Sequence, residues 1–190
     1  MAKRFPRIEP AHRDFIARQR VFFTATAAPG ARVNVSPREA GALRVLGPAS
    51  AAFLDLTGSG CETAAHLRVD GRMTLMFCAF EGPPSILRLY GRGRSLPRGG
   101  DGYARLLEEA FGGDEPPGAR QIVLLDIDLV QTSCGYGVPL FDHVGERPAI
   151  RRWAEAKGEA GLEAYRREKN AASLDGLPSG LVPAGEVAAP

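Results

Sequence analysis

Cysteine and long apolar runs are both scarce in this sequence. Only 3 of its 190 residues are Cys, and none of them belongs to a Cys-x-x-Cys pair. A small secreted fold held by disulfides needs more cysteine, so we expect free thiols and a cytoplasmic protein. The apolar runs fall well short of the ~20 residues of a membrane helix, and no apolar segment follows the basic N-terminus. We therefore expect neither a membrane span nor a signal peptide.

The net charge is small and histidines are few as well. The sequence has 24 Lys+Arg against 22 Asp+Glu, a net charge of +2, which is too small to indicate a nucleic-acid partner. A nucleic-acid-binding barrel is therefore the weakest of the hypotheses. The 3 His are far apart in the sequence, so no metal site is predicted. No Gly-x-Ser-x-Gly elbow is present either, and the residues predict no catalytic side chain.

Glycine and proline are plentiful, with 23 Gly and 15 Pro, and they separate short apolar runs. Residues 32–36 and 125–130 alternate between apolar and polar side chains, as half-buried strands do. Seven strands are predicted, at residues 21–27, 32–36, 43–46, 51–56, 73–80, 86–94 and 122–132. Helices are predicted at residues 10–20, 62–68, 102–111 and 148–169. Because few helices separate the strands, the pattern favours an antiparallel β-barrel or sandwich over a parallel sheet.

The length suits one domain, residues 1–190. Within it we expect a β core over residues 20–140 and a helical extension over residues 145–175. Residues 176–190 show no periodicity, so a mobile tail is expected there.

The junction before the predicted helix at residues 62–68 is the segment most suggestive of a binding site. It joins Thr57, Ser59 and Thr63 through two glycines, and free N–H groups at such a helix start suit a phosphate. Ser59 and Glu62 also have the spacing of a capping box, so the loop could simply cap its own helix. Arg32 and Arg38 lie near strand ends and could complete an anion site or belong to a solvated face.

Three further residues are candidates for a substrate-facing surface. Cys134 and Tyr136 lie in a Gly-Tyr-Gly-Val-Pro turn after the last predicted strand, where an aromatic ring could cover a planar ligand. Trp153 could wall the same side, although its position on the apolar stripe of the long helix favours a place in the core.

Taken together, these segments resemble the pyridoxamine 5'-phosphate oxidase family, and within it a subgroup distinct from the true oxidases. The resemblance runs from residue 21 to residue 136, and its anchors are residues 32–36, 52–57, 62–67 and 72–77. It implies a six-stranded antiparallel split barrel of Greek-key type, with the long helix added at the C-terminal end. It also implies a homodimer with FMN at the dimer interface and a small-molecule substrate or electron donor.

The resemblance assigns the FMN contacts to particular positions. They are Arg32, Val33, Asn34, Val35, Ser36 and Arg38 along one strand, Leu56 and Thr57 at the end of another, and Ser59, Glu62 and Thr63 at the phosphate. The true oxidases have a basic pair where this chain has Glu62-Thr63, and the usual lysine of the strand is replaced by Pro37. Because a carboxylate repels phosphate, either an arginine compensates or the ligand differs.

These departures, and the absence of an Arg-His signature in residues 150–190, argue against pyridoxamine-phosphate oxidation. The prediction is therefore an FMN-dependent oxidoreductase of unassigned substrate. The alternative is a non-catalytic protein that holds a flavin, a deazaflavin or haem on the same barrel.

Overall fold

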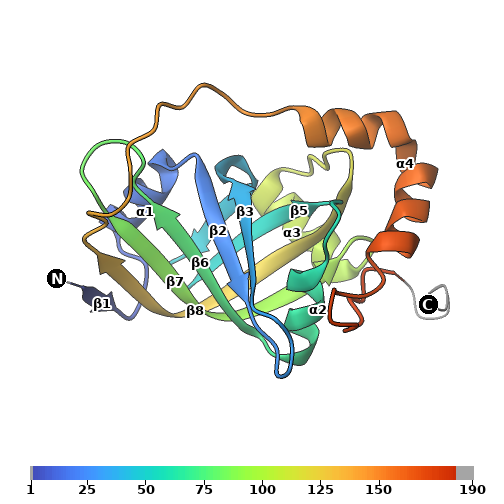
Figure 1. Ribbon diagram of the computed structural model, residues 1–190, viewed down its shortest axis with the longest axis horizontal. Helices are drawn as coiled ribbons and strands as arrows, with labels where there is room; N and C mark the ends of the chain where they lie inside the picture. Colours follow the sequence, from blue (N-terminus) through green and yellow to red (C-terminus); the bar gives the residue numbers. More distant parts are fainter. Residues whose placement is uncertain (1, 183–190) are drawn as a thin grey trace.

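One antiparallel sheet organises the molecule, and residues 2–182 are described in this computed structural model (Figure 1). Its strands are β1 (Lys3–Phe5), β2 (Val21–Thr26), β3 (Asn34–Glu39), β4 (Leu43–Gly47), β5 (Ser50–Leu56), β6 (Arg72–Cys78), β7 (Ile86–Pro97) and β8 (Ala119–Ser133). The order across the sheet is β3-β2-β6-β7-β8-β5-β4, and β1 pairs with the far end of β8. This confirms the predicted split-barrel class and all seven strands read from the sequence.

The described chain has eight strands rather than the six that the resemblance implied. The strand missed by periodicity is β1, which has only three residues and thus no pattern to read. It pairs at Lys3–Thr132 to Phe5–Val130, on the part of β8 that lies beyond the β5 pairing. A strand this short is set by the free edge of its neighbour rather than by its own sequence.

Helices cover the sheet unevenly. They are α1 (Pro10–Arg18), α2 (Glu62–Val69), α3 (Asp101–Phe111) and α4 (Ala149–Lys169), with a short 3₁₀ turn at Ala40–Ala42. As predicted, Pro10 begins α1 at a position where its missing N–H costs nothing. The backbone of α4 breaks at Gly158, whose φ of 63° is left-handed, so α4 consists of two helical pieces at an angle. No helix among residues 2–182 has the length and apolar character needed to cross a membrane.

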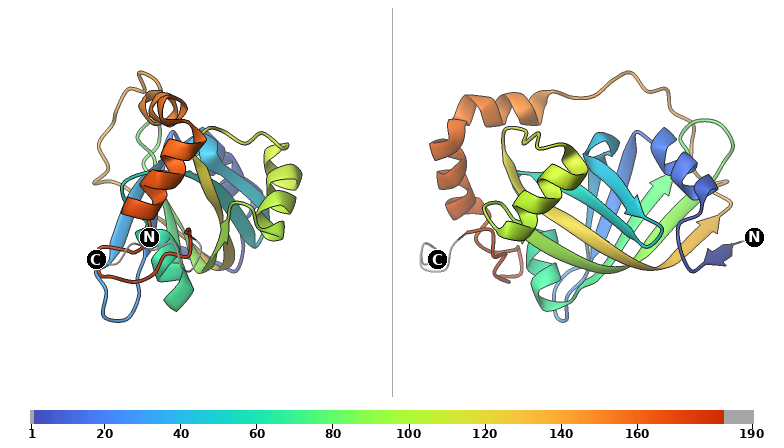
Figure 2. Two further views of the ribbon diagram at one scale, coloured as in Figure 1. Left: turned by 90° about the vertical axis from the view of Figure 1, so that its right-hand side faces the viewer. Right: turned by 180° about the vertical axis from the view of Figure 1, so that it is seen from behind.

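The core lies inside the curl of the sheet. Phe22, Phe53 and Phe77 are fully or almost fully buried there, and the Phe22 ring lies 5.6 Å from that of Phe53 and 5.8 Å from that of Phe77. A second, smaller cluster lies on the outside of β5 and β8, where α3 packs with Tyr103, Leu106 and Phe111 (Figure 2, right). Both sides of β5 are therefore covered, which explains its nearly continuous buried run.

No helix of residues 2–182 lies on the outer side of the β3-β2-β6-β7 half (Figure 1). Direct strand partners place one apolar group on this side, because paired residues face the same way. We call it the open face, and it comprises Phe23, Ala25, Val35, Pro37, Met76 and Tyr90. Val35 is 61% exposed, and Phe23, Met76 and Tyr90 are half-buried.

Candidate functional site

The start of α2 meets the edge strand β3 through a row of neutral polar groups. Alternation along β3 turns Asn34 and Ser36 inward, opposite Thr26 and Thr24 of β2. The Asn34 amide Nδ2 donates to the hydroxyls of Thr26 and Thr63, at 3.1 Å each. One side chain therefore joins β3, β2 and the first turn of α2.

The row continues into the molecule at His66. The Thr26 hydroxyl lies 3.1 Å from His66 Nδ1, and the Ser36 hydroxyl donates to Asn34 Oδ1 at 3.1 Å. His66 is fully buried, and its Nε2 has no hydrogen-bond partner among the described residues. Because such groups are costly to bury, this nitrogen is a feature that packing alone does not explain.

Both arginines expected near a phosphate are already paired with carboxylates. The guanidinium of Arg32 and its backbone N–H both bind Asp175, the N–H at 2.8 Å. Arg38 points inward and pairs with Asp55. Neither cation therefore faces solvent alone at the start of α2.

Asp55 is the centre of a buried ionic network. Its Oδ2 accepts hydrogen bonds from Arg120 Nε at 2.9 Å and from Gln121 Nε2 at 2.7 Å. Burial alone would raise the pKa of Asp55, but the guanidinium groups of Arg120 and Arg38 and the Gln121 amide outweigh it and lower that pKa. Arg120 also donates to Asn170 Oδ1 at 2.9 Å, so the network reaches the end of α4.

The sequence patterns did not predict this network. Asp55 was a visible signal, since it is a carboxylate inside the apolar run 51–56. A buried charge of that kind requires a partner. Its partners Arg120 and Gln121 lie 65 and 66 residues further along the chain, and no local pattern links them to it.

Leu56 and Thr57 contact parts of the molecule other than β3. Leu56 packs in the small cluster under α3. The Thr57 hydroxyl is fully buried, donates to the Gly118 carbonyl at 2.8 Å and accepts from Arg166 Nε at 2.9 Å. Thr57 thus anchors α4 to the barrel, and Arg166 also donates to the Ala119 carbonyl at 3.1 Å.

The 57–63 junction is closed by the Glu62 carboxylate rather than by a side-chain cap of α2. Cys61, not Ser59, precedes the first helical residue, and no side-chain cap bond forms there. Glu62 bends back instead, with one carboxylate oxygen accepting from the Cys61 N–H at 2.8 Å and the other from the Leu174 N–H at 3.3 Å. Ser59 is exposed, and the Ser59–Glu62 capping box is absent.

The Cys61 thiol is buried beside this junction and donates to the Ala172 carbonyl at 3.1 Å. Burial, together with the nearby Glu62 carboxylate, raises its pKa to about 11. The thiol is therefore protonated at neutral pH and acts as a structural contact.

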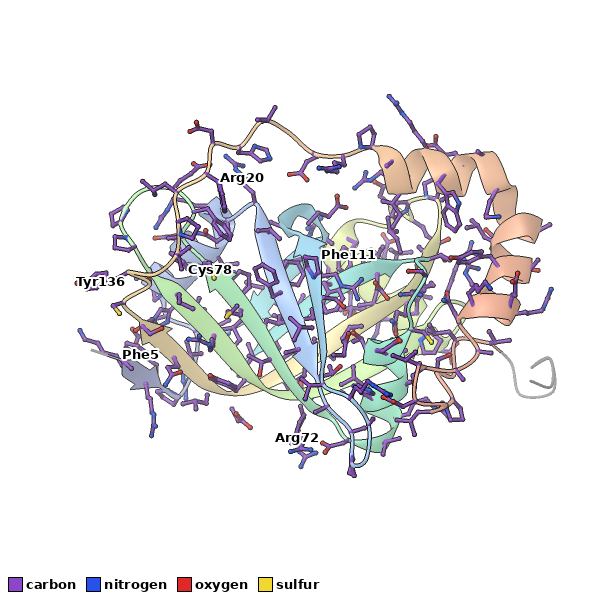
Figure 3. The ribbon with its side chains drawn as sticks, viewed as in Figure 1. Phe5, Arg20, Arg72, Cys78, Phe111 and Tyr136 are labelled. Atoms are coloured by element: carbon purple, nitrogen blue, oxygen red, sulfur yellow. The ribbon has the colours of Figure 1, made fainter. Side chains whose placement is uncertain are left out.

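The residues proposed for a substrate-facing surface lie elsewhere. Tyr136 is 82% exposed and lies at the end of the barrel away from α2 (Figure 3). Cys134 belongs to the same loop and is also exposed. Trp153 belongs to α4, with its ring 5.0 Å from that of Tyr165 and the Lys157 ammonium 5.4 Å from it. The structure does not bring these three residues to the start of α2.

A cavity of about 1050 Å³ opens between the sheet and the long segment of residues 134–148. It reaches the end of β3 at Pro37–Glu39, and aromatic side chains such as Phe15, Phe80 and Phe141 line it. The Phe141 N–H donates to the Phe80 carbonyl at 2.9 Å, which holds the segment over the opening. None of Cys134, Tyr136 and Trp153 lines this cavity.

A phosphate does not fit the start of α2 in the arrangement described. The Glu62 carboxylate takes the Cys61 N–H, and the Asp175 carboxylate takes the Arg32 backbone N–H and guanidinium. Two carboxylates thus occupy donors that an anion would need. Within residues 2–182, no group of three His, Cys, Asp or Glu side chains is placed to hold a metal ion.

Comparison with known proteins gives the same family twice. The family model described as pyridoxamine 5'-phosphate oxidase matches residues 8–134. A protein of Aspergillus flavus, the pyridoxamine 5'-phosphate oxidase family protein ustO, is 40% identical over 182 residues that cover 87% of this chain and 73% of the relative.

Solved structures share the fold at low identity. A variant of HupZ from Group A Streptococcus has a TM-score of 0.52 at 14% identity, covering 66% of this chain and 99% of its own. A pyridoxamine 5'-phosphate oxidase candidate from Lactobacillus delbrueckii has a TM-score of 0.51 at 15% identity, covering 66% of this chain and 94% of its own. At such identities the likeness concerns the fold alone.

Proposed function

Because the chain belongs to the pyridoxamine 5'-phosphate oxidase family, we propose that it is a flavin-binding redox protein whose ring site lies on the open face beside β3. The supporting observation is this uncovered face, with Val35, Phe23 and Met76 on adjoining strands next to a free strand edge. A planar apolar ring is the kind of ligand that such a surface accepts. FMN is the cofactor that the family implies, and a flavin would supply hydride and electron transfer when bound.

The chain's own residues would orient the ring rather than perform acid–base chemistry. Among the described strands, β3 pairs only with β2, so the other edge of its backbone is available to a ligand. Val33 is 71% exposed and Val35 is 61% exposed, so both can pack against a ring without rearrangement. The cavity of about 1050 Å³ adjoins the end of the same strand and is where we place the substrate or electron donor.

The proposed assembly is a homodimer formed through the open face. An apolar sheet surface is costly to leave in water, and a second copy would cover it. The proposed location is the cytoplasm, where Cys61, Cys78 and Cys134, all free thiols, would stay reduced.

The first experiment is an absorbance and mass spectrum of the purified protein, followed by titration with FMN, riboflavin, a deazaflavin and haem. The proposal predicts stoichiometric flavin binding and reduction of that flavin by NADH or NADPH. A colourless protein that takes up no flavin would contradict it.

The two carboxylates at the start of α2 favour a second candidate function, a carrier that holds its ligand without turnover. A bound flavin that NADH, NADPH and reduced deazaflavin all leave oxidised would support this carrier. Haem uptake in place of flavin would support the haem-binding form of the same alternative.

A further inference from the structure

The C-terminal hairpin, residues 171–179, is a folded part of the barrel surface rather than a loose tail. Ala172 and Pro178 form an antiparallel bridge, and the Ser173 N–H donates to the Leu177 carbonyl at 2.9 Å. Gly176 closes the turn with a φ of 80°, a conformation that favours glycine. Of the tail expected over residues 176–190, residues 176–182 are thus described and packed, and the rest lies outside the described residues.

Buried polar groups anchor the base of this hairpin. Asn170 is fully buried, accepts from Arg120 and donates to the Gly58 carbonyl at 3.0 Å. Ser179 is 1% exposed, and its N–H donates to the Ala171 carbonyl at 2.9 Å while its hydroxyl donates to the Asn170 carbonyl at 2.5 Å. Removing the hairpin would leave these buried groups without partners, which is costly.

The anchored base holds the hairpin tip over the first turn of α2. There the Leu174 N–H binds Glu62, and Asp175 binds the backbone N–H and the guanidinium of Arg32. The Arg32 backbone N–H, with the nearby guanidinium, also lowers the pKa of Asp175, so this carboxylate is ionised at neutral pH. The tip therefore brings a fixed negative charge to the start of β3.

The charges at this place disfavour a phosphate. Asp175 pairs with Arg32, while the Glu62 carboxylate accepts hydrogen bonds from the Cys61 and Leu174 backbone N–H groups. Arg38 is committed to Asp55, and Arg68 lies against Gly180 at the base of the hairpin. A dianionic phosphate would approach the carboxylates of Glu62 and Asp175, and both would repel it.

The remaining groups at this place suit hydroxyl groups instead. A hydrogen-bonded row of neutral side chains is formed by Asn34, Ser36 and Thr63. Ser59, four residues before Thr63 in the sequence, is exposed to solvent. Carboxylates accept hydrogen bonds from hydroxyl groups and present no repulsion to them. The two carboxylates can accept hydrogen bonds from the hydroxyl groups of a polyol, and the neutral side chains can donate to them or accept from them.

We propose that the C-terminal hairpin makes the start of α2 select the flavin by the end of its side chain. A neutral polyol, as in riboflavin, binds there in preference to a phosphate, and Asp175 and Glu62 are the discriminating residues. This inference rests on the proposed flavin site.

The test compares riboflavin with FMN by fluorescence titration of the full chain at low and high salt. The native protein should bind riboflavin about tenfold more tightly than FMN, and added salt should narrow that ratio because it screens the repulsion. Asp175→Asn and Glu62→Gln should each lower the ratio several-fold, chiefly by strengthening FMN binding. Asp114→Asn, which removes an exposed carboxylate from the loop after α3, should leave the ratio unchanged.

Two results would overturn the inference while keeping the flavin site. One is FMN binding by the native protein as tight as riboflavin binding or tighter. The other is a ratio that Asp175→Asn and Glu62→Gln leave unchanged while both variants keep the native melting temperature. Hydrogen exchange at the Leu174 amide adds an independent readout. This amide should stay protected from exchange when riboflavin binds. Faster exchange when FMN binds would show that the phosphate displaces the hairpin, as the inference expects. Failure of both flavins to bind would instead remove the proposed flavin site, and this inference with it.

Discussion

At the scale of single residues, Asp55 shows how one buried charge joins distant parts of the chain. It is 1% exposed and meets Arg38, Arg120 and Gln121. Through Arg120 it connects β3, β5 and β8 to Asn170 beneath the C-terminal hairpin. A group with so many buried partners stabilises the fold only while all of them are present.

Asp55→Asn should therefore lower the free energy of unfolding by about 3–5 kcal/mol, because Arg120 would stay buried without a counter-charge. Urea denaturation at neutral pH measures this. The matched control is Asp126→Asn, whose carboxylate pairs with Arg94 in solvent and should change stability by less than about 1 kcal/mol. Equal losses in the two variants would contradict the prediction.

The same residue predicts the pH dependence of stability. The pKa of Asp55 is lower in the folded protein than in the unfolded chain, where it is about 3.9. Its contribution is therefore complete above that unfolded pKa and is lost as the pH falls through the lower, folded pKa. The urea midpoint of the native protein should decrease as the pH is lowered from 5. The midpoint of Asp55→Asn should decrease less over the same pH range. Parallel pH profiles would show that other carboxylates control acid unfolding.

At the scale of elements, the backbones of β7 and β8 approach each other so closely at Gly91 that a side chain there would not fit. A Cβ added at Gly91 would overlap the Asp126 carbonyl oxygen, at the register shift between Tyr90 and Gly91. This glycine thus permits the bulge in the longest strand pair of the sheet.

Gly91→Ala should destabilise the protein by about 3 kcal/mol, since the contact is with backbone and the strands would have to separate. Thermal and urea unfolding measure the loss. Gly41→Ala is the control, because nothing lies within 4 Å of its added Cβ, and it should cost less than about 1 kcal/mol. A stable Gly91→Ala protein would show that the bulge can move.

At the scale of the whole molecule, the helices cover the barrel unevenly and leave the open face uncovered. α3 covers the outside of β5 and β8, while no described helix covers the β3-β2-β6-β7 half (Figures 1 and 2). The apolar side chains of the open face lie on this half, and Val35 among them is 61% exposed. The proposed homodimer would bury this face and place two ring sites at one interface.

Sedimentation equilibrium tests this assembly, since one chain has a mass of 20.3 kDa and the proposed species is a dimer. Val35→Asp places a charge on the open face and should weaken the dimer by about 2–5 kcal/mol, which yields monomers at micromolar concentration. Val69→Asp is the matched control, because Val69 is 54% exposed at the end of α2, away from that face, and its dimer should persist. A native protein that sediments as a monomer would refute the assembly.

Local sequence patterns predicted seven of the eight described strands and the four helices, and the segments together indicated the family. Alternation along residues 125–130, Pro10 at the start of α1 and the glycine-rich turns are local signals, because the pleat and the helix repeat within a few residues. The contacts at the start of α2, in contrast, arise from the way the folded chain brings distant residues together. Asp175 reaches Arg32 across 143 residues, and no periodicity records which distant carboxylate will neutralise a given arginine. The physical reason is that a local pattern states which way a side chain faces, whereas the partner of a charge depends on how the whole chain closes around it.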